Sequence, residues 1–523
     1  MLPATDPDTT PVPRRLIAAL VLMRVLIPLA LVHPEWEFQR DEMLYFAMGD
    51  HLAWRMQFPP MIAVIAHLSA TVFGDTVWAA RVPAALAGGA LTGVVLTLVR
   101  KLGGGRFAAW CAWLALLAAP VYMRPSVLFQ PVILDQLWAA AAVAALVLAA
   151  REDRPSRWLF VGTALGLGLL TKASAVMYGA VILGVTLVHP RLRPQLATRW
   201  PWLGALMAFT LGLPSLLGQI HFGWPFLQQL EILQRTQLTH TSVFGTIMGQ
   251  GFLLCGATFA VGAALWAAIR SLRRKDAPKS EPNAFTVEAQ LAALFAIGLL
   301  GAILWRGGKD YYAAPAYPVL VGVGAVWLAP RLGRTRKTVL QVVVGTIALV
   351  VAPMGIPMLA PEPMERYAAA LGVGTTTNRG GKLALPQDYA DMLGWREEAE
   401  AVAAEYAKLT PAEQAVTTIA GGNFGQTGAL AVFRRRFGYP YPVSSAGDFH
   451  AWGPGEHNGE VLIVAASPDA LEDLQQLYAD VRVVRKLRDS RRVFEEQEVH
   501  IFLCRQPRKP LAEIWPSIGP EWD

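Results

Sequence analysis

Long runs of apolar residues, separated by short polar stretches, fill the first two thirds of the chain. A helix needs roughly 17–25 mostly apolar residues to cross a membrane. Runs of about that length lie near residues 16–33, 78–99, 106–123, 132–150, 157–171, 173–189, 200–220, 247–269, 286–305, 311–329 and 338–358. This pattern predicts a polytopic α-helical membrane protein with about eleven transmembrane helices.

Lysine and arginine are concentrated in alternate loops between these runs. The positive loops contain Arg14 and Arg15 and the stretches 100–106, 151–157, 191–199, 270–279 and 331–337. Short positive loops stay on the cytoplasmic side, and the alternation holds only if residues 157–189 cross the membrane an even number of times. The N-terminus is therefore predicted to be cytoplasmic. The first long loop, 34–77, and the end of the chain are predicted to lie outside.

The pattern changes after residue 360. Residues 389–409 predict an amphipathic helix, and residues 468–479 a second helix. Short strands are predicted at 416–420, 460–466, 480–487 and 500–504. Strands that alternate with helices are typical of an α/β domain. We therefore expect a transmembrane catalytic domain, residues 1–360, and an extracytoplasmic α/β domain, residues 361–523.

The composition agrees with a membrane protein. Hydrophobic residues make up 54% of the chain and charged residues 16%, against about 25% charged residues in an average soluble domain. The net charge of +7 could suggest nucleic acid, but the positive residues lie in the short loops where membrane topology puts them. We therefore expect a membrane surface, and no nucleic acid, as the partner of these charges.

Two adjacent carboxylates, Asp41 and Glu42, follow the first apolar run. If residues 40–54 form an interfacial helix, Asp41 and Tyr45 share one face, whereas Glu42 points elsewhere. A desolvated carboxylate can have its pKa raised toward neutrality, which suits a general base. The alternative is a solvated loop that happens to carry acidic residues.

Lys309, Tyr311 and Tyr312 stand between the ninth and tenth runs. A lysine with a tyrosine hydroxyl suits a phosphate group, but lysine and tyrosine at the end of a span also serve as interface anchors. Three further basic residues are predicted to lie on the same outer face. They are Arg81, Lys172 and Arg235.

Arg24 lies in the middle of the first run, where a charged residue is rare. It could pair with Asp135 or extend toward the cytoplasmic side. The histidines near the outer face form no metal-binding pair. His240 is the one weak candidate for a divalent metal together with an acidic residue, and an interface histidine is the favoured interpretation.

Several short motifs, in a fixed order, resemble the bacterial members of the dolichyl-phosphate-mannose-protein mannosyltransferase family, which include the lipid A aminoarabinose transferases. The motifs are Asp41-Glu42-x-x-Tyr45, Phe58-Pro59-Pro60, Arg81, Gly166-Leu-Gly-Leu-Leu-Thr-Lys172 and Lys309-x-Tyr-Tyr-x-x-Pro315-x-x-Pro318. The similarity covers most of residues 14–330. In the tail, residues 384–395 and 422–429 resemble stretches common in these bacterial proteins.

The resemblance implies a GT-C fold in the bacterial inner membrane and a donor sugar carried on a polyprenyl phosphate. The family's catalytic aspartate falls on Asp41, with Glu42 beside it. Its donor-phosphate contacts fall on Lys309, Tyr312 and Arg235. The residues expected to shape the site or meet the acceptor are Tyr45, Pro59, Pro60 and Tyr311.

One departure from the family concerns the residues before the proline pair. The aminoarabinose transferases have Glu-Lys there, and this chain has Gln57-Phe58. Lys172 or Arg81 would therefore have to supply the missing positive charge. A divalent metal remains the one cofactor left open.

The chemistry implied is an inverting sugar transfer to a lipid, a glycan or a protein. A secondary transporter or lipid flippase is the first alternative, but such proteins tend to contain inverted repeats, and no repeat is visible here. The second alternative is a membrane scaffold without catalysis, which would lose nothing with Asp41.

The charge alternation predicts the side of each loop. An export-dependent reporter fused after residue 360 is expected to be active, whereas reporters fused at residues 103, 195 and 275 are expected to behave as cytoplasmic. Activity of these fusions in intact cells is the measurement. A cytoplasmic tail would contradict the predicted topology, because Asp41 and the tail share one side in it.

Overall fold

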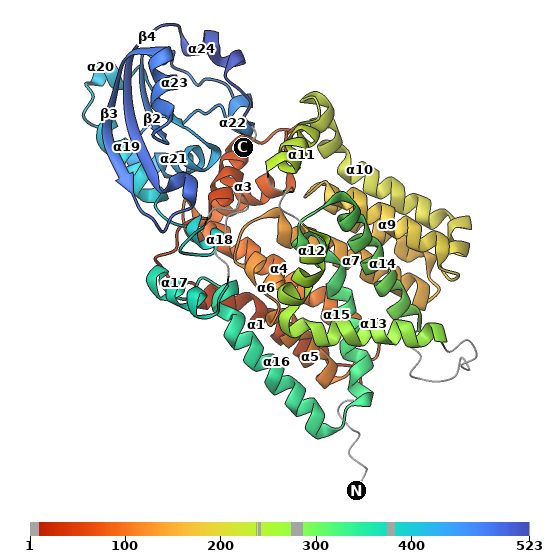
Figure 1. Ribbon diagram of the computed structural model, residues 1–523. Coiled ribbons are helices and arrows are strands. Elements are labelled where there is room, and N and C mark those ends of the chain that lie inside the picture. The colour runs from red at the N-terminus through yellow and green to blue at the C-terminus, as the bar shows by residue number, and fades with distance from the viewer. Residues whose placement is uncertain (1–9, 237, 239–241, 274–285, 374–381, 522–523) are drawn as a thin grey trace. The chain divides into compact units, whose positions relative to one another are not determined.

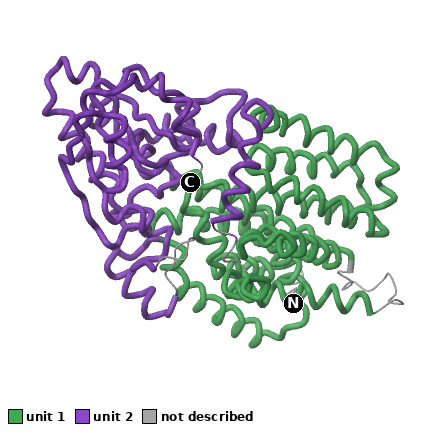
Figure 2. The backbone as a smooth tube through the Cα atoms, turned by 45° about the horizontal axis from the view of Figure 1, so that its top comes forward, with its two compact units in different colours: residues 1–31, 81–218, 241–356 green, residues 32–80, 219–240, 357–523 purple. Residues whose placement is uncertain are grey.

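The computed structural model describes residues 10–236, 238, 242–273, 286–373 and 382–521. The chain forms two compact units (Figure 2). The first unit contains residues 1–31, 81–218 and 241–356, and the second contains residues 32–80, 219–240 and 357–523. The tail thus forms one unit with the first long loop and with the segment 219–240.

The first unit is helical throughout its described part. Its helices are α1 (Arg14–Leu31), α4 (Val77–Lys101), α5 (Arg106–Leu117), α6 (Pro120–Met123), α7 (Pro131–Arg151), α8 (Trp158–Leu169), α9 (Ser174–Val188), α10 (Arg199–His221), α12 (Val243–Leu254), α13 (Thr258–Arg273), α14 (Thr286–Arg306), the 3-10 helix η6 (Asp310–Ala316), α15 (Tyr317–Leu328) and α16 (Arg334–Gly355). Helices α4 and α10 run from one unit into the other.

Each apolar run of the sequence corresponds to a helix or a pair of helices, which confirms a polytopic helical protein. Among the described residues, seven helices are long and apolar enough to cross a membrane. The count becomes eight if the pair at Arg106–Leu117 and Pro120–Ser126, bent by 84°, is taken as one span. The expected number of about eleven is not confirmed, because α8 and α9 are shorter than a full span and α1, which carries three arginines in 18 residues, is not among the candidates.

Helices of the first unit approach one another through glycine. A Cβ atom at Gly324 of α15 would overlap the backbone of Ala260 in α13, and one at Gly162 of α8 would overlap the backbone of Gly204 in α10. Small residues at such crossings let membrane helices pack backbone to backbone.

Arg24 of α1 bridges to the break that follows α5. Its guanidinium donates to the carbonyl of Tyr122 at 2.7 Å and to the hydroxyl of Ser126 at 2.8 Å, and the side chain is 1% exposed. A broken helix leaves carbonyl groups without helical partners, and Arg24 satisfies one of them. Its partners are thus these two groups and not Asp135.

The second unit combines helices from the first long loop with the tail domain. Its elements are α2 (Arg40–Asp50), α3 (Met61–Phe73), α11 (Pro225–Thr236), α17 (Pro361–Ala370), α18 (Gln387–Ala390), α19 (Trp395–Tyr406), α20 (Pro411–Gln414), β1 (Thr417–Gly421), α21 (Phe424–Phe437), α22 (Gly447–Ala451), β2 (Val461–Ala466), α23 (Ala470–Leu477), β3 (Tyr478–Arg488), β4 (Glu498–Pro507) and α24 (Leu511–Ile514). All four predicted strands and the helix predicted at 468–479 are confirmed within a few residues.

The single helix predicted over residues 389–409 is wrong in its first part. Gly394 has φ +88° and separates α18 from α19. The position needs glycine for two reasons. Its positive φ disfavours a side chain, and a Cβ there would overlap the guanidinium of Arg492, which is buried against Glu397 and Glu398.

The tail sheet has the order β1-β2-β4-β3 (Figure 1). Strands β1 and β2 are parallel, and the other two pairings are antiparallel. Helix α23 packs on one face, through the core of Leu462, Val464, Leu474 and Phe502. Side chains alternate along a strand, so Ile463 and its cross-strand partners Ile419 and Leu503 point to the opposite face. Helix α19 contacts β2, β3 and β4 there.

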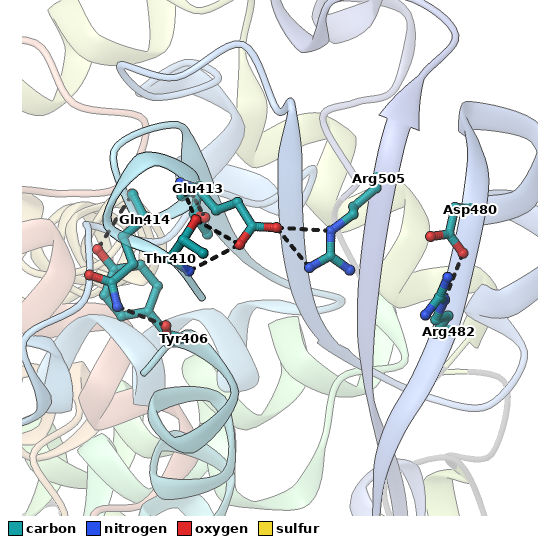
Figure 3. A network of polar contacts seen from close by, with 8 residues as sticks. Tyr406, Thr410, Glu413, Gln414, Asp480, Arg482 and Arg505 are labelled. Atoms are coloured by element: carbon teal, nitrogen blue, oxygen red, sulfur yellow. Dashed lines mark hydrogen bonds and ion pairs between the residues drawn. The ribbon is translucent and has the colours of Figure 1, made fainter. Parts of the chain in front are cut away.

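A polar network joins helix α20 to strand β4 (Figure 3). Glu413 accepts two hydrogen bonds from Thr410 in a capping box, and it accepts two more from the guanidinium of Arg505. Asp480 and Arg482 form a separate ion pair on β3 at 2.9 Å. These pairs are partly or largely exposed, and exposed ion pairs contribute little stability.

Candidate active site

A capping box fixes the start of helix α2. The side-chain oxygen of Gln39 accepts the N–H of Asp41 at 2.9 Å, and Glu42 accepts the N–H of Gln39 at 2.8 Å. Such a box satisfies backbone donors that the first turn of a helix leaves unpaired. A helix therefore begins here, as predicted, although it ends at Asp50 rather than at Trp54.

Glu42 is fully buried, and its carboxylate belongs to this cap. A side chain held in that way starts the helix and satisfies the backbone N–H of Gln39. Its visible task is structural, so Glu42 is a weaker candidate for the base than its neighbour Asp41.

Asp41 lies in the first turn of α2 and is half-buried. The partial positive charge of a helix N-terminus favours a carboxylate at this place. Tyr45 follows one turn later, and its ring centroid lies 6.0 Å from that of Phe58. Burial, with Asp41, Glu42 and Asp448 nearby, raises the pKa of Tyr45 well above 10. Its phenol therefore stays protonated as a hydrogen-bond donor beside Asp41.

The two prolines of the sequence motif set the path of the chain after α2. Pro59 and Pro60 are partly buried, and Pro60 precedes the first residue of α3. The carbonyl of Gln57 accepts the side-chain amide of Gln219 at 2.7 Å. The fixed φ of proline holds the turn beside Phe58, the residue against which Tyr45 packs.

Four residues predicted for the donor phosphate or its surroundings meet in the first unit. The Lys172 ammonium lies 5.2 Å from the ring centroid of Tyr312, and the Lys309 ammonium lies 5.9 Å from that of Tyr311. The two tyrosine rings meet edge to face at 4.8 Å. The turn between α8 and α9 and the start of η6 thus gather two ammonium groups and two phenols. We call these four residues the lysine–tyrosine cluster.

The surroundings of the lysine–tyrosine cluster are built from hydrogen bonds. Gln250 donates to the carbonyl of Asp310 at 3.1 Å and accepts the hydroxyl of Tyr317 at 2.8 Å, which fixes η6. Behind Lys172, the Asp135 carboxylate accepts hydroxyl groups from Ser174 at 2.7 Å and Tyr178 at 2.6 Å. Asp135 also interacts electrostatically with Lys172, so the ammonium sits near a fixed carboxylate.

The other two basic candidates have different surroundings. Arg81 is 1% exposed and donates to the carbonyl of Val127 at 2.7 Å. Arg235 is largely exposed on α11, where it pairs with Glu231 at 2.6 Å. Arg81 and Arg235 stay as sequence predictions for the phosphate.

No group of three or more histidine, cysteine, aspartate or glutamate residues placed to hold a metal is found in the described part of the chain. His240, the weak metal candidate, lies outside the described residues. A divalent metal therefore gains no support from the described side chains.

A cavity of about 550 Å³ opens at the end of α2. Trp452 stacks on His51 there, with ring centroids 4.0 Å apart and planes 3° apart. Tyr441, Glu456 and His457 line the same cavity. Sequence reasoning had not singled out these residues, because they come from loops that only the fold brings together.

Comparisons with known proteins agree with the resemblance seen in the sequence. The family model described as dolichyl-phosphate-mannose-protein mannosyltransferase matches residues 57–217, which confirms the resemblance. The arabinofuranosyltransferase AftD from mycobacteria shares 12% sequence identity with this chain at a TM-score of 0.45. The alignment covers 98% of this chain but 42% of that protein, and a likeness at this level does not establish a common fold. No curated protein matches the sequence.

Sequence reasoning missed the partners that support the candidate residues. Asp135 had been considered as a possible partner of Arg24, and its hydrogen bonds to Ser174 and Tyr178 had no signal in the sequence. Asp391, which contacts Arg40 beside the candidate base, had likewise not been singled out. The motif at residues 384–395 contained it, but its contact with α2 spans most of the chain.

The buried Asp448 predicts a pH-dependent stability. Burial raises the pKa of Asp448 from 3.8 to about 7, so the folded protein holds a proton there that the unfolded chain has lost. This difference lowers the stability as the pH rises from about 4 to 7, by up to about 4 kcal/mol. We expect Asp448→Asn to melt at a higher temperature than the parent at pH 8.

The advantage of Asp448→Asn should shrink as the pH falls toward 4. Thermal melting of both full-length proteins in detergent at pH 5 and pH 8 is the measurement. An equal difference at the two pH values would contradict the raised pKa.

Proposed function

We propose that this protein is a membrane-embedded, inverting glycosyltransferase of the outer face of the bacterial inner membrane. Its donor is a sugar on a polyprenyl phosphate, and its acceptor is a hydroxyl or amine of a lipid, a glycan or a protein. The observation that carries the proposal is the lysine–tyrosine cluster, in which Lys172, Lys309 and Tyr312 come together from segments far apart in the sequence. The family match over residues 57–217 supports the same class.

Asp41 is the proposed general base. Its carboxylate takes the proton of the acceptor hydroxyl while the acceptor oxygen forms a bond to the anomeric carbon. The bond between that carbon and the phosphate oxygen breaks, and the polyprenyl phosphate leaves with the electron pair. Attack and departure on opposite sides of the carbon invert its configuration. A positioned base of this kind contributes about 10²–10⁴-fold in rate.

The lysine–tyrosine cluster is the proposed donor-phosphate site. Negative charge builds up on the phosphate as the glycosidic bond breaks, and fixed positive charges and hydroxyl donors stabilise it. Lys172 and Lys309 supply the charges, and Tyr311 and Tyr312 supply the hydroxyl groups. In this proposal Lys172 provides the charge that the motif Gln57-Phe58 lacks. Arg81 and Arg235 remain the additional candidates.

Replacement of the proposed base gives the first test. Asp41→Asn keeps the shape of the side chain and removes its basicity, so sugar transfer by the purified protein should fall about 10²–10⁴-fold. Asp50→Asn is the matched control, because it removes a carboxylate from the other end of α2, where Asp50 pairs with Arg434. A transporter or a scaffold would show no sugar transfer in the parent or in either variant. Full transfer by Asp41→Asn would overturn the assignment of Asp41 as the base, and Glu42 would inherit the role.

Replacement of the two lysines tests the phosphate site. Lys309→Met and Lys172→Met each remove a charge-assisted contact, which is worth roughly 1.5–3 kcal/mol, so donor affinity or single-turnover rate should fall about ten- to a hundredfold. Lys309→Arg should restore the affinity only in part, because a guanidinium does not replace an ammonium at a compact site.

Lys337→Met is the control for the lysine variants. Lys337 also lies over an aromatic ring, that of Phe107 at 5.1 Å, but outside the lysine–tyrosine cluster. If the lysines only anchored their helices at the interface, all three methionine variants would behave alike.

A further inference from the structure

The two tail motifs, residues 384–395 and 422–429, have no role in the proposed chemistry, yet both contact the helix that carries Asp41. Helices α2 and α21 pack together within the second unit, and α18 and its following turn meet the chain just before α2. These contacts come from the part of the tail that the family resemblance had marked.

The first motif reaches the start of α2 through Asp391. The Asp391 carboxylate lies 3.6 Å from the Arg40 guanidinium and accepts the Gln39 side-chain amide at 3.4 Å. Its backbone carbonyl accepts the N–H of Arg40 at 3.1 Å and the indole N–H of Trp395 at 2.7 Å. The same Gln39 side chain also caps α2, because its oxygen accepts the N–H of Asp41. Asp391 thus contacts both residues that precede Asp41.

The second motif supplies the surface on which α2 lies. A Cβ at Gly428 would stand 3.0 Å from the Met43 side chain and 3.1 Å from the backbone nitrogen of Leu44. A Cβ at Gly425 would stand 2.6 Å from the side chain of Arg40. The Arg40 guanidinium also lies 5.1 Å from the ring centroid of Phe424. A side chain at Gly425 would therefore displace Arg40, and one at Gly428 would press tightly against α2.

We infer that these two tail motifs form a clamp that positions the catalytic aspartate, with Asp391 and Gly428 as positioning residues for Asp41. The inference rests on the proposed function, because it assigns the clamp to the base of that reaction. Asp391 and Gly428 do not touch the reacting groups. They hold the first turn of α2, on which the Asp41 carboxylate is carried.

The need for such a clamp follows from the reaction itself. A general base must stay within hydrogen-bond reach of the proton it removes, and a displacement of about 1 Å can cost about 10²-fold in rate. A helix of 11 residues has little stability of its own in water. Contacts from outside the helix must therefore fix its position.

The buried environment of Asp391 makes the clamp sensitive to substitution. Burial raises the pKa of Asp391 to about 7, although the positive charge of Arg40 opposes this shift. Asp391 and Arg40 therefore stabilise each other at a buried position where either charge alone would be unfavourable. Removing the charge of one partner while leaving the other buried is costly.

Two variants and two readouts test the clamp. Asp391→Asn removes the charge and keeps the shape, and Gly428→Val adds a side chain between α2 and α21. We expect each to lower kcat for sugar transfer about 10- to 100-fold while KM for the donor changes less than about twofold. Hydrogen–deuterium exchange of the α2 amides should become faster by a similar factor. Exchange of β2 and β4 should not change.

Asp480→Asn is the matched control in the same domain, because it removes a carboxylate from the exposed ion pair on β3 (Figure 3). It should leave both the exchange of α2 and kcat unchanged. If Gly428→Val also speeds exchange in β2 and β4, the tail has unfolded, and Asp391→Asn then decides the question.

The outcomes separate this inference from the proposed function. Slow α2 exchange in both variants would overturn the clamp whatever Asp41 does. Faster α2 exchange with an unchanged kcat would overturn its role in positioning, provided that Asp41→Asn is inactive. If Asp41→Asn is fully active, the assignment of Asp41 as the base fails, and faster α2 exchange would still support the clamp as a structural contact. If the purified parent transfers no sugar, the proposed function fails, and the exchange of α2 still tests the clamp.

Discussion

Moving a charged side chain out of water costs several kcal/mol of free energy unless polar groups of the protein replace its lost hydration. This chain buries several such groups, and each buried charge described above has specific polar partners in the protein. Arg24 bonds to the backbone and a hydroxyl at a helix break. Asp135 accepts two hydroxyl groups, and Arg81 donates to a carbonyl. These bonds join helices that hydrophobic packing alone would leave free to slide. The Arg24 bonds lie beside the bent pair that follows α5.

The same constraint acts in the second unit. Arg492 is enclosed by Glu397 and Glu398 beneath the turn at Gly394. Arg40 is held between Asp391 and the ring of Phe424. Both pairs lie near the joint between α18, α19 and α21. The polar interior of the tail is therefore concentrated where it meets α2, whereas the apolar core around Phe502 lies under α23.

Much of the fold could be predicted from the sequence because the signals are local. Apolar runs predicted the helices of the first unit, and all four strands of the tail were predicted within a few residues. The break at Gly394 escaped prediction because its cause is Arg492, almost a hundred residues away. The number of spans differs from the sequence prediction for another reason, because α8 and α9 are short and α1 carries three arginines.

The candidate site shows the same contrast between residues that local motifs indicate and contacts that only the fold creates. The motifs indicated Lys172, Lys309 and Tyr312, and the structure brings Lys172 to Tyr312. The motifs could not show that Glu42 caps its own helix, because Asp-Glu pairs in the first turn have several uses. Nor could they show the partner of Arg40, because that contact depends on how the tail folds back to the first loop.

That contact has a consequence for the order of events during synthesis. Gln39 and Asp391 are 352 residues apart in the chain. A ribosome that adds about 5–20 residues per second makes the second residue roughly 20–70 s after the first. Throughout that interval the helices of the first unit can enter the membrane, while α2 has no α21 to lie against. The nascent protein therefore passes through a long stage in which its membrane helices can already be inserted. The helix that carries Asp41 still lacks the tail helix against which it packs.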